Sequence, residues 1–378
     1  MYISSRRHVI PLFMILTCWL VGAVAGCSRS NPPPLLSTSP AESDPAQEQK
    51  DDTDTTVKKR IRASRAAAKA LSREARKLEP FVKTDWVRGF LSATQYLPAV
   101  TPRKLYYDRS GGKVYSEREV QALGEEERAK LEKHTRHGGF YYNSKHGSPL
   151  AYCRALDVLG AEGFKLRPGV KIADYGYGSI GQLRLLASLG AEVVGIEVDP
   201  ELRALYSEPG DQGPIQGAKG VTGTLRLLHG LFPSDEELMR SMGKGYDLFM
   251  SKNVLKNGYI HPARPPGSPP LLDLGVEEQA FVQTMYDLLN PGGYVLIYNI
   301  CPPEAAPDET YIPWADGHSP FSIEMYESVG FRVLVFDRDD TQATRGMARL
   351  LGWEEKAQAM GVSKDLFAWY TIVRKPDA

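Results

Sequence analysis

The 378-residue sequence has no excess of either charge, because its 46 basic residues balance its 46 acidic ones. A balanced chain has no general affinity for polyanions, so nucleic acid is not expected as a partner. The sequence also has no internal repeat, and no Cys/His group has the spacing of metal ligands. No metal is therefore implied.

Long hydrophobic runs are also scarce. The one candidate covers residues 9–25, contains Pro11 and follows Arg6 and Arg7. At about 17 residues it is marginal for crossing a bilayer, and it fits the apolar part of an export signal better. An uncleaved membrane anchor remains the alternative.

The end of this run, Val24-Ala25-Gly26-Cys27, resembles a bacterial lipobox. The resemblance implies a signal peptide over residues 1–26 and an acylated Cys27 as the first mature residue. It also implies a protein held at the cell envelope by its N-terminal lipid. A cytoplasmic location follows if the lipobox is misread.

Only four cysteines occur in the sequence. The signal peptide would remove Cys18, and lipid would occupy Cys27. The remaining two, Cys153 and Cys301, are expected in a helix before the first strand and in a loop after the fifth strand. Nothing in these positions favours a disulfide, so we expect two free thiols.

The segment after Cys27 is rich in Pro, Ser, Asp, Gln and Thr, which cannot build a core, so residues 27–57 are expected to form a flexible tether. Residues 58–78 are alanine-rich with a thin apolar stripe, and they predict a helix with many basic residues. This helix could lie on anionic lipid or cell-wall polymer, or it could pack lightly on the domain. Residues 58–136 are expected to be a small, mainly helical accessory region.

From residue 137 onward the sequence predicts one large domain, residues 137–378. Strands and helices alternate regularly, which favours a Rossmann-like α/β fold: a doubly wound, mostly parallel seven-stranded sheet with helices on both faces. The last two strands should form a hairpin, with a long insertion between residues 338 and 364. Strands are expected at 171–175, 192–197, 224–229, 246–251, 293–299, 331–337 and 367–374.

The most informative segment is a strand, a glycine-rich turn, a helix and a second strand. Asp174 ends the first strand, the turn carries Gly176, Gly178 and Gly181, and Glu197 ends the second strand. Such a unit binds a nucleoside cofactor at the carboxyl edge of a parallel sheet, and the second acid can accept ribose hydroxyls.

Glycine spacing alone also fits a dinucleotide site. A pyrophosphate gains nothing from a carboxylate before the first glycine, whereas Asp174 suits a ligand with an ammonium or a sulfonium. With Glu197 and the later turn Asn290-Pro291-Gly292-Gly293, this arrangement resembles the class I S-adenosylmethionine-dependent methyltransferases. The resemblance covers about residues 149–374. One departure is that the third glycine falls at Gly181, where the family has it at the position of Ile180.

The resemblance implies S-adenosylmethionine as the cofactor. Its contacts are expected at Asp174, Gly176, Gly178, Gly181 and Glu197, with His229 at the end of the third strand beside the base. Residues 137–149, the lead-in segment, often close over the cofactor in this family; here a lid and a plain loop are both open readings.

The methyl group should point toward the end of the fourth strand. Catalytic candidates there and in the long loop 254–275 are Asn253, His261, Lys252 and Tyr259. As general bases, His261 and His318 of the loop 301–320 are preferred to Lys252 and Tyr259. These loops could form a substrate pocket or simply cover the sheet edge. The residues after Met250 lack the signature of nucleobase and glutamine amide methyltransferases.

The expected function is methyl transfer to an unidentified acceptor. S-adenosylmethionine is made in the cytoplasm, however, and the leader directs this protein outside. The second hypothesis is therefore a non-catalytic envelope lipoprotein that retains a nucleoside-binding fold. An NAD-dependent oxidoreductase is third, because Asp174 and the Pro-Gly-Gly turn disfavour it.

Overall fold

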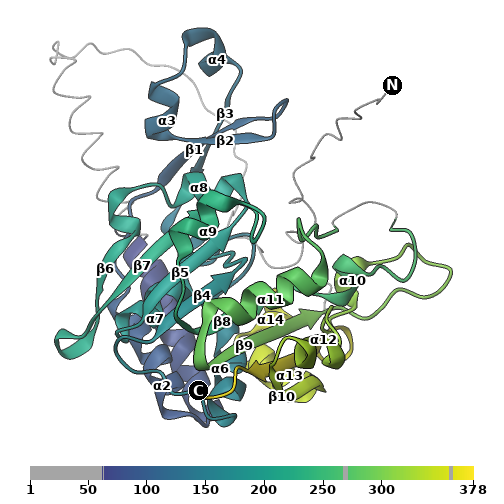
Figure 1. Cartoon of the computed structure of the whole chain (residues 1–378). Coiled ribbons are helices and arrows are strands. Elements are labelled where there is room, and N and C mark those ends of the chain that lie inside the picture. Colours follow the sequence, from purple (N-terminus) through teal and green to yellow (C-terminus); the bar gives the residue numbers. More distant parts are fainter. Residues whose placement is uncertain (1–61, 63, 267–270, 357–360) are drawn as a thin grey trace, which may run out of the picture.

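The computed structural model describes residues 62, 64–266, 271–356 and 361–378. The expected signal peptide, tether and acylated Cys27 lie outside the described residues. Figure 1 shows one sheet at the centre of the molecule, with helices on both of its faces and a small separate sheet near the top.

The central sheet has eight strands in the order β10-β11-β9-β8-β4-β5-β7-β6. Neighbouring strands from β9 to β7 are parallel, whereas β11 is antiparallel to both its neighbours and β6 is antiparallel to β7. The strands are β4 (Lys171–Tyr175), β5 (Glu192–Glu197), β6 (Gly213–Gln216), β7 (Thr222–His229), β8 (Tyr246–Lys252), β9 (Leu289–Cys301), β10 (Arg332–Asp339) and β11 (Phe367–Arg374).

The two faces of this sheet carry separate apolar clusters. Helix 64–78 and α2 (Asp85–Ser92), α6 (Cys153–Ala161), α7 (Ile180–Ser188), α8 (Pro200–Leu205) and α13 (Thr341–Leu350) contribute to one cluster. Helices α9 (Glu236–Met242), α11 (Glu278–Leu288) and α12 (Ile323–Ser328) contribute to the other. Inner strands such as β4 are buried on both faces, as expected for a parallel sheet between two helical layers.

This architecture confirms the Rossmann-like fold class. The sheet has one strand more than the seven that the alternation predicts, because β6 adds to the edge beside β7. Strand β6 is short and contains Pro214, which an edge strand tolerates because one side of its backbone needs no partner. So short a segment has no periodicity that sequence analysis could detect.

The accessory region also differs from the mainly helical expectation. It contains a three-stranded antiparallel sheet, β2-β1-β3, formed by β1 (Arg103–Asp108), β2 (Lys113–Ser116) and β3 (Glu132–Arg136). Strand β3 lies in the charged part of this region, which was expected to be mainly helical. It pairs with β1, and this tertiary pairing overrides the helical preference of its residues. The helices here are α3 (Glu117–Gln121) and α4 (Glu125–Ala129).

Short elements complete the described chain. The described part of the insertion between β10 and β11 contains helices, and β10 and β11 pair as the expected hairpin. The boundary between the accessory region and the main domain stays a prediction. The remaining elements are η1 (Glu79–Phe81), η2 (Ala93–Tyr96), α5 (Gly138–Tyr142), η3 (Pro149–Tyr152), η4 (Pro209–Asp211), η5 (Ala218–Gly220), α10 (Asn257–Ile260), η6 (Pro313–Ala315), α14 (Trp353–Lys356) and α15 (Val362–Asp365).

A search of the described helices finds none with the length and apolarity needed to cross a membrane.

Candidate functional site

The glycine-rich turn lies between β4 and α7, at the carboxyl edge of the sheet. Gly176 and Gly178 both adopt left-handed backbone conformations, with φ values of 70° and 57°. A Cβ on Gly178 would lie 2.8 Å from the Cβ of His146, and one on Gly176 would lie 2.4 Å from Cγ2 of Val254. Both positions therefore require glycine, for conformational and for steric reasons.

The third glycine, Gly181, is required for a different reason, namely close packing. Gly181 lies inside α7, and a Cβ there would be 2.7 Å from Cγ of Pro149. Ser179 caps this helix, accepts a hydrogen bond from the Gly181 N–H at 3.3 Å, and donates to the Tyr142 carbonyl at 2.7 Å. The displaced third glycine thus allows the lead-in segment to pack closely on the start of α7.

Asp174 is completely buried beneath the turn. Gln182 donates to its carboxylate at 3.1 Å, and the Tyr152 hydroxyl donates at 3.5 Å. Burial raises the pKa of Asp174 to about 7, although these hydrogen bonds and the cation of Lys252 oppose the shift. In this conformation the Asp174 carboxyl group is fully enclosed by protein, and the buried Gln182 amide oxygen has no hydrogen-bond partner among the described residues.

Glu197 is also buried, and its carboxylate holds the turn. One oxygen accepts from the Gly178 N–H at 3.1 Å, and the other accepts from the N–H groups of Val198 at 2.8 Å and Asp199 at 3.2 Å. Burial raises the pKa of Glu197. A carboxylate has about four acceptor positions, so roughly one remains for a ribose hydroxyl. Binding of both hydroxyls requires the turn to adjust.

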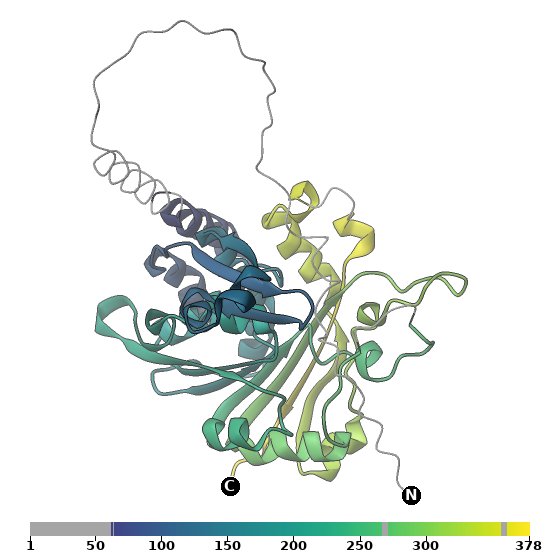
Figure 2. The same cartoon turned by 90° about the horizontal axis from the view of Figure 1, so that it is seen from above.

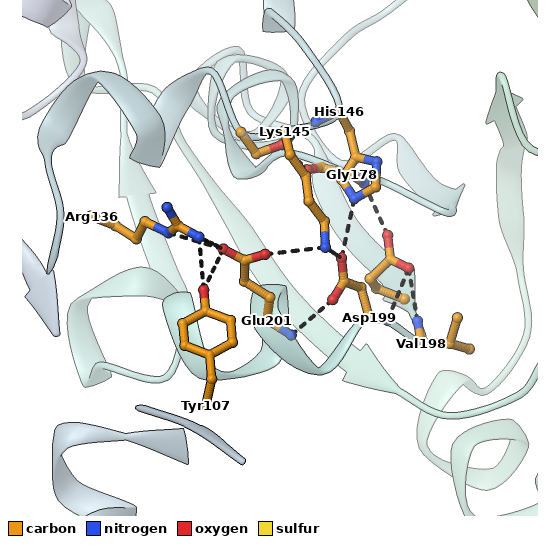
Figure 3. Close-up of polar contacts among 10 residues, drawn as sticks. Tyr107, Arg136, Lys145, His146, Gly178, Val198, Asp199 and Glu201 are labelled. Carbon is orange, nitrogen blue, oxygen red and sulfur yellow. Dashed lines mark hydrogen bonds and ion pairs between the residues drawn. The ribbon is translucent and has the colours of Figure 1, made fainter. Parts of the chain in front are cut away.

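The lead-in segment covers this turn. Ser144 donates to the Gly178 carbonyl, and Lys145 forms ion pairs with Asp199 at 2.5 Å and Glu201 at 3.1 Å. Figure 3 shows Lys145 and His146 pointing together toward Asp199, where the His146 Nε2 lies 3.2 Å from the carboxylate. We call these contacts of Lys145 and His146 with Asp199 and Glu201 the latch.

Burial alone would raise the pKa of Asp199. The hydrogen bond from His146 and the charge of Lys145 outweigh this effect and lower it. Asp199 also caps α8, because its second oxygen accepts from the Glu201 N–H at 2.8 Å. The latch therefore joins the lead-in segment to the start of α8 and, through it, to the end of β5.

The latch continues into the accessory sheet. Glu201 accepts a hydrogen bond from Arg136 of β3 at 2.7 Å and another from the Tyr107 hydroxyl of β1 at 2.7 Å. The sequence offers the segment with Lys145 and His146 as a possible lid, but it does not predict their contacts with Asp199 and Glu201. The only local signal is that Asp199-Pro200 reads as the capped start of a helix.

The edge beyond Glu197 offers a partly apolar surface. Val198 directly follows β5 and is 45% exposed, and Leu231, two residues after the end of β7, is 37% exposed. The two strand ends are joined by a hydrogen bond from the Gly230 N–H to the Glu197 carbonyl at 3.2 Å. Burial and the charge of Arg203 lower the pKa of His229 to about 4, so its ring is neutral at pH 7. A neutral ring with two apolar neighbours fits a planar base; the role of His229 stays a prediction.

Lys252 is the catalytic candidate that the structure brings near Asp174. It ends β8, next to β4, where the strand order reverses and ligands bind in such sheets. Its ammonium lies 5.2 Å from the ring centre of Tyr152, which also contacts Asp174. Burial, together with the nearby charge of Lys256, lowers the pKa of Lys252 to about 8.

The side chain and backbone of Asn253 form hydrogen bonds with the neighbouring strand β9. Asn253 has a φ of 66°, and its side-chain oxygen accepts from the Ile300 N–H at 2.7 Å while its own N–H donates to the Tyr298 carbonyl at 3.1 Å. These bonds join the end of β8 to β9, so the Asn253 side chain is occupied by the backbone of the neighbouring strand.

His261 and Tyr259 lie on or beside α10, within the long loop. His261 contacts the Pro320 carbonyl at 3.1 Å and Glu278 at 3.2 Å, and burial raises the pKa of Tyr259. His318 pairs with Asp316 at 2.8 Å, which raises the pKa of His318. The structure does not bring these three side chains into contact with Lys252 or Asp174.

The two long loops pack on each other. Lys256 donates to the carbonyls of Ile300 at 2.7 Å and Trp314 at 2.9 Å, and the Asn257 N–H donates to the His318 carbonyl at 2.9 Å. These contacts favour the reading in which the loops cover the sheet edge. Cys153 and Cys301 are both buried and unpaired, and no metal-binding group occurs among the residues that the structure describes.

No protein-family model matches the sequence, and no curated protein matches it. Among solved structures, a cyclase, SpnF, is similar over 60% of this chain and 82% of its own, with 18% identity and a TM-score of 0.35. An S-adenosylmethionine-dependent methyltransferase from Mesorhizobium loti is similar over 59% of this chain and 97% of its own, with 16% identity and a TM-score of 0.32.

A third similar structure is phosphoethanolamine N-methyltransferase 2 of Haemonchus contortus, which was solved with phosphomonomethylethanolamine and S-adenosylhomocysteine. It is 12% identical over 66% of this chain and 63% of its own, with a TM-score of 0.35. These proteins are alike in fold, and the strand order described above establishes the fold of this chain independently.

Proposed function

We propose that this protein binds S-adenosylmethionine at the carboxyl ends of β4 and β5 and transfers its methyl group to an acceptor near the end of β8. The observation that carries the proposal is the convergence of two buried carboxylates, Asp174 and Glu197, on a turn with two left-handed glycines. No such pair of acids is needed to connect a strand to a helix.

The residues present fit this cofactor. The glycine turn allows close approach of a ligand, Glu197 has about one free acceptor position for a ribose hydroxyl, and Val198, Leu231 and the neutral ring of His229 offer a surface for adenine. The lead-in segment lies over the turn, so it has to move for the cofactor to enter. A segment that closes in this way would also exclude water from the reaction.

The bound cofactor would supply a methyl group on a positively charged sulfur, which reacts by in-line displacement. The chain's own contribution is alignment of the acceptor with that methyl group. Lys252 is our proposed proton acceptor for a hydroxyl or ammonium acceptor, because burial lowers its pKa to about 8 and a useful fraction is neutral near pH 7. The charge of Asp174, beside it, would stabilise the protonated amine once Lys252 has accepted the proton.

A non-catalytic role is the second candidate. The side chains of His146 and Val254 fill the space beside Gly178 and Gly176. A protein that binds no ligand would also have such a filled turn. A dinucleotide is a weaker candidate, because its pyrophosphate would lie against Asp174, Glu197 and Asp199. These buried acids oppose a second anion.

We also propose that the protein is held at the cell envelope by lipid on Cys27. The support is the lipobox-like sequence, which lies outside the described residues. In that location the cofactor has to be carried out in bound form or be present on the same side of the membrane.

Calorimetric titration tests the cofactor assignment. The chain from Ser28 onward should bind S-adenosylmethionine and S-adenosylhomocysteine but not NAD. Glu197→Ala should weaken binding by about 1.5–3 kcal/mol, the scale for charge-assisted hydrogen bonds, whereas Glu192→Ala, at the exposed start of the same strand, should not. Saturable binding of NAD without binding of either adenosyl ligand would refute the proposal.

The role of Lys252 is tested by Lys252→Met, which keeps the length of the side chain without the amine. Methyl transfer should be lost while cofactor affinity stays within about 0.5 kcal/mol. Cofactor binding without any methyl transfer from labelled S-adenosylmethionine to extracts of the producing organism would support the non-catalytic candidate instead.

A further inference from the structure

The first described helix, residues 64–78, separates two kinds of side chain onto opposite faces. Ala68, Leu71, Ala75 and Leu78 face the domain, and all are 8% exposed or less. Leu71, Ala75 and Leu78 belong to the core that covers one face of the central sheet. The helix is therefore firmly packed on the domain, which fixes the direction in which its other face points.

The opposite face is basic. Its exposed cations recur every three or four residues, so they form one stripe along the helix, about 22 Å long at 1.5 Å per residue. The cations of this basic face are Arg62, Arg65, Lys69, Arg73, Arg76 and Lys77. Figure 2 shows the helix, in deep purple, on the outside of the molecule.

Acids are scarce along this helix in the described part of the chain. Glu74 is the one acid in residues 62–78, and it lies to the side, between the basic and the buried faces. No ion pair or hydrogen bond to the six cations occurs among the described residues. The whole sequence is electrically neutral, so the stripe is a local concentration of charge rather than part of a generally basic surface.

We propose that this basic face lies against an anionic phospholipid bilayer and sets the orientation of the domain on it. The stripe is straight and sequential, which matches a flat array of headgroups, and each cation near such a surface adds to the attraction. The proposal does not depend on methyl transfer or on any bound cofactor.

The position of the helix in the chain supports a bilayer as the occupant. The helix is the first described element after the expected anchor, and Arg62 follows Cys27 by 62 − 27 = 35 residues. A chain of 35 residues spans at most about 120 Å when fully extended. An anchor at Cys27 would thus keep the basic face within reach of the same membrane.

Vesicle flotation tests the proposal on the full chain carrying Cys27→Ser, so that lipid attachment does not contribute. Vesicles of equal parts phosphatidylcholine and phosphatidylglycerol are compared with phosphatidylcholine alone. The variant Arg65→Gln/Lys69→Gln/Arg73→Gln should reduce partitioning to the anionic vesicles by about a hundredfold, at about fivefold per charge. Binding to the neutral vesicles should not change.

The matched control is Lys165→Gln/Arg167→Gln/Arg240→Gln, which removes the same charge from exposed positions elsewhere. It should bind anionic vesicles like the parent. Equal loss in both variants, equal binding of the parent to both kinds of vesicle, or tighter binding of the parent to duplex DNA would overturn the proposal. If the helix variant fails to fold, salt titration of the parent decides, because a charge-driven contact must weaken as salt rises.

Discussion

The closed position of the lead-in segment over the glycine turn can be tested with one methyl group. Gly178→Ala places a Cβ where φ is 57° and where the Cβ of His146 lies 2.8 Å away. The left-handed backbone alone should cost about 1–2 kcal/mol of the free energy of unfolding. The overlap with His146 should add about 1–3 kcal/mol, the usual cost of overpacking.

His146→Gly separates the two contributions, because the three atoms nearest the new methyl group all belong to the His146 side chain. In the double variant the overlap should vanish and the backbone cost should stay. The two changes should therefore show a coupling energy of about 1–3 kcal/mol. Gly210→Ala is the matched control, since nothing lies within 4 Å of the added methyl group and the backbone is not left-handed; it should stay within about 0.5 kcal/mol of the parent.

The assay is urea unfolding of the parent, the two single variants, the double variant and the Gly210→Ala control, followed by far-ultraviolet circular dichroism. Equal m-values would show that the variants expose the same surface on unfolding, so that differences in midpoint report stability. Additive effects within about 0.5 kcal/mol would refute the reasoning. Gly178 and His146 would then not touch in solution, and the closed lead-in segment would be wrong.

Three further predictions follow from the site and the leader. Burial raises the pKa of Asp174 from 3.8 to about 7, so its stabilising contribution is full below pH 3.8 and is lost as the pH rises through 7. Asp174→Asn should therefore reduce the pH dependence of the free energy of unfolding over that range, measured by urea melts. An unchanged pH dependence would contradict the burial of Asp174. Lys145→Ala removes one cation from the latch at buried Asp199. It should lower the free energy of unfolding by about 3 kcal/mol and speed amide hydrogen exchange at the glycine turn, whereas Lys165→Ala, at an exposed position, should do neither. Unchanged exchange in Lys145→Ala would argue against the latch. Cys27→Ser should abolish lipid attachment, measured by mass spectrometry of membrane fractions, and an intact Met1 terminus in the parent would disprove the processing.

The fold was accessible from the sequence because its signals are local. Apart from β6, the strands from β4 to β11 each read as a run rich in apolar residues, and the two faces of each helix follow a short period. Asp174, the glycine turn and Glu197 fall within one strand–helix–strand unit, so their proximity follows from its geometry. Strand β6 and the accessory strands β1, β2 and β3 were not predicted for the opposite reason, since they exist through pairing with a neighbouring strand.

For the catalytic candidates, position along the chain does not determine where each side chain points. Lys252 and Asn253 are adjacent in sequence, yet Lys252 lies by Tyr152, and Asn253 bonds to the backbone of β9. Which way each side chain points depends on the left-handed backbone of Asn253 and on the partner strand. Neither can be read from a window of sequence.

The sequence by itself determined the fold class, the glycine turn and its two acids, because these arise from periodicity and from backbone needs within short segments. Only the tertiary structure decided that the lead-in segment lies over the turn, and that Lys145 joins Asp199 and Glu201 into a latch with the accessory sheet. It also decided that the basic face of helix 64–78 points outward. The physical reason is that these contacts join residues distant in sequence, whose energies exist only after burial brings them together.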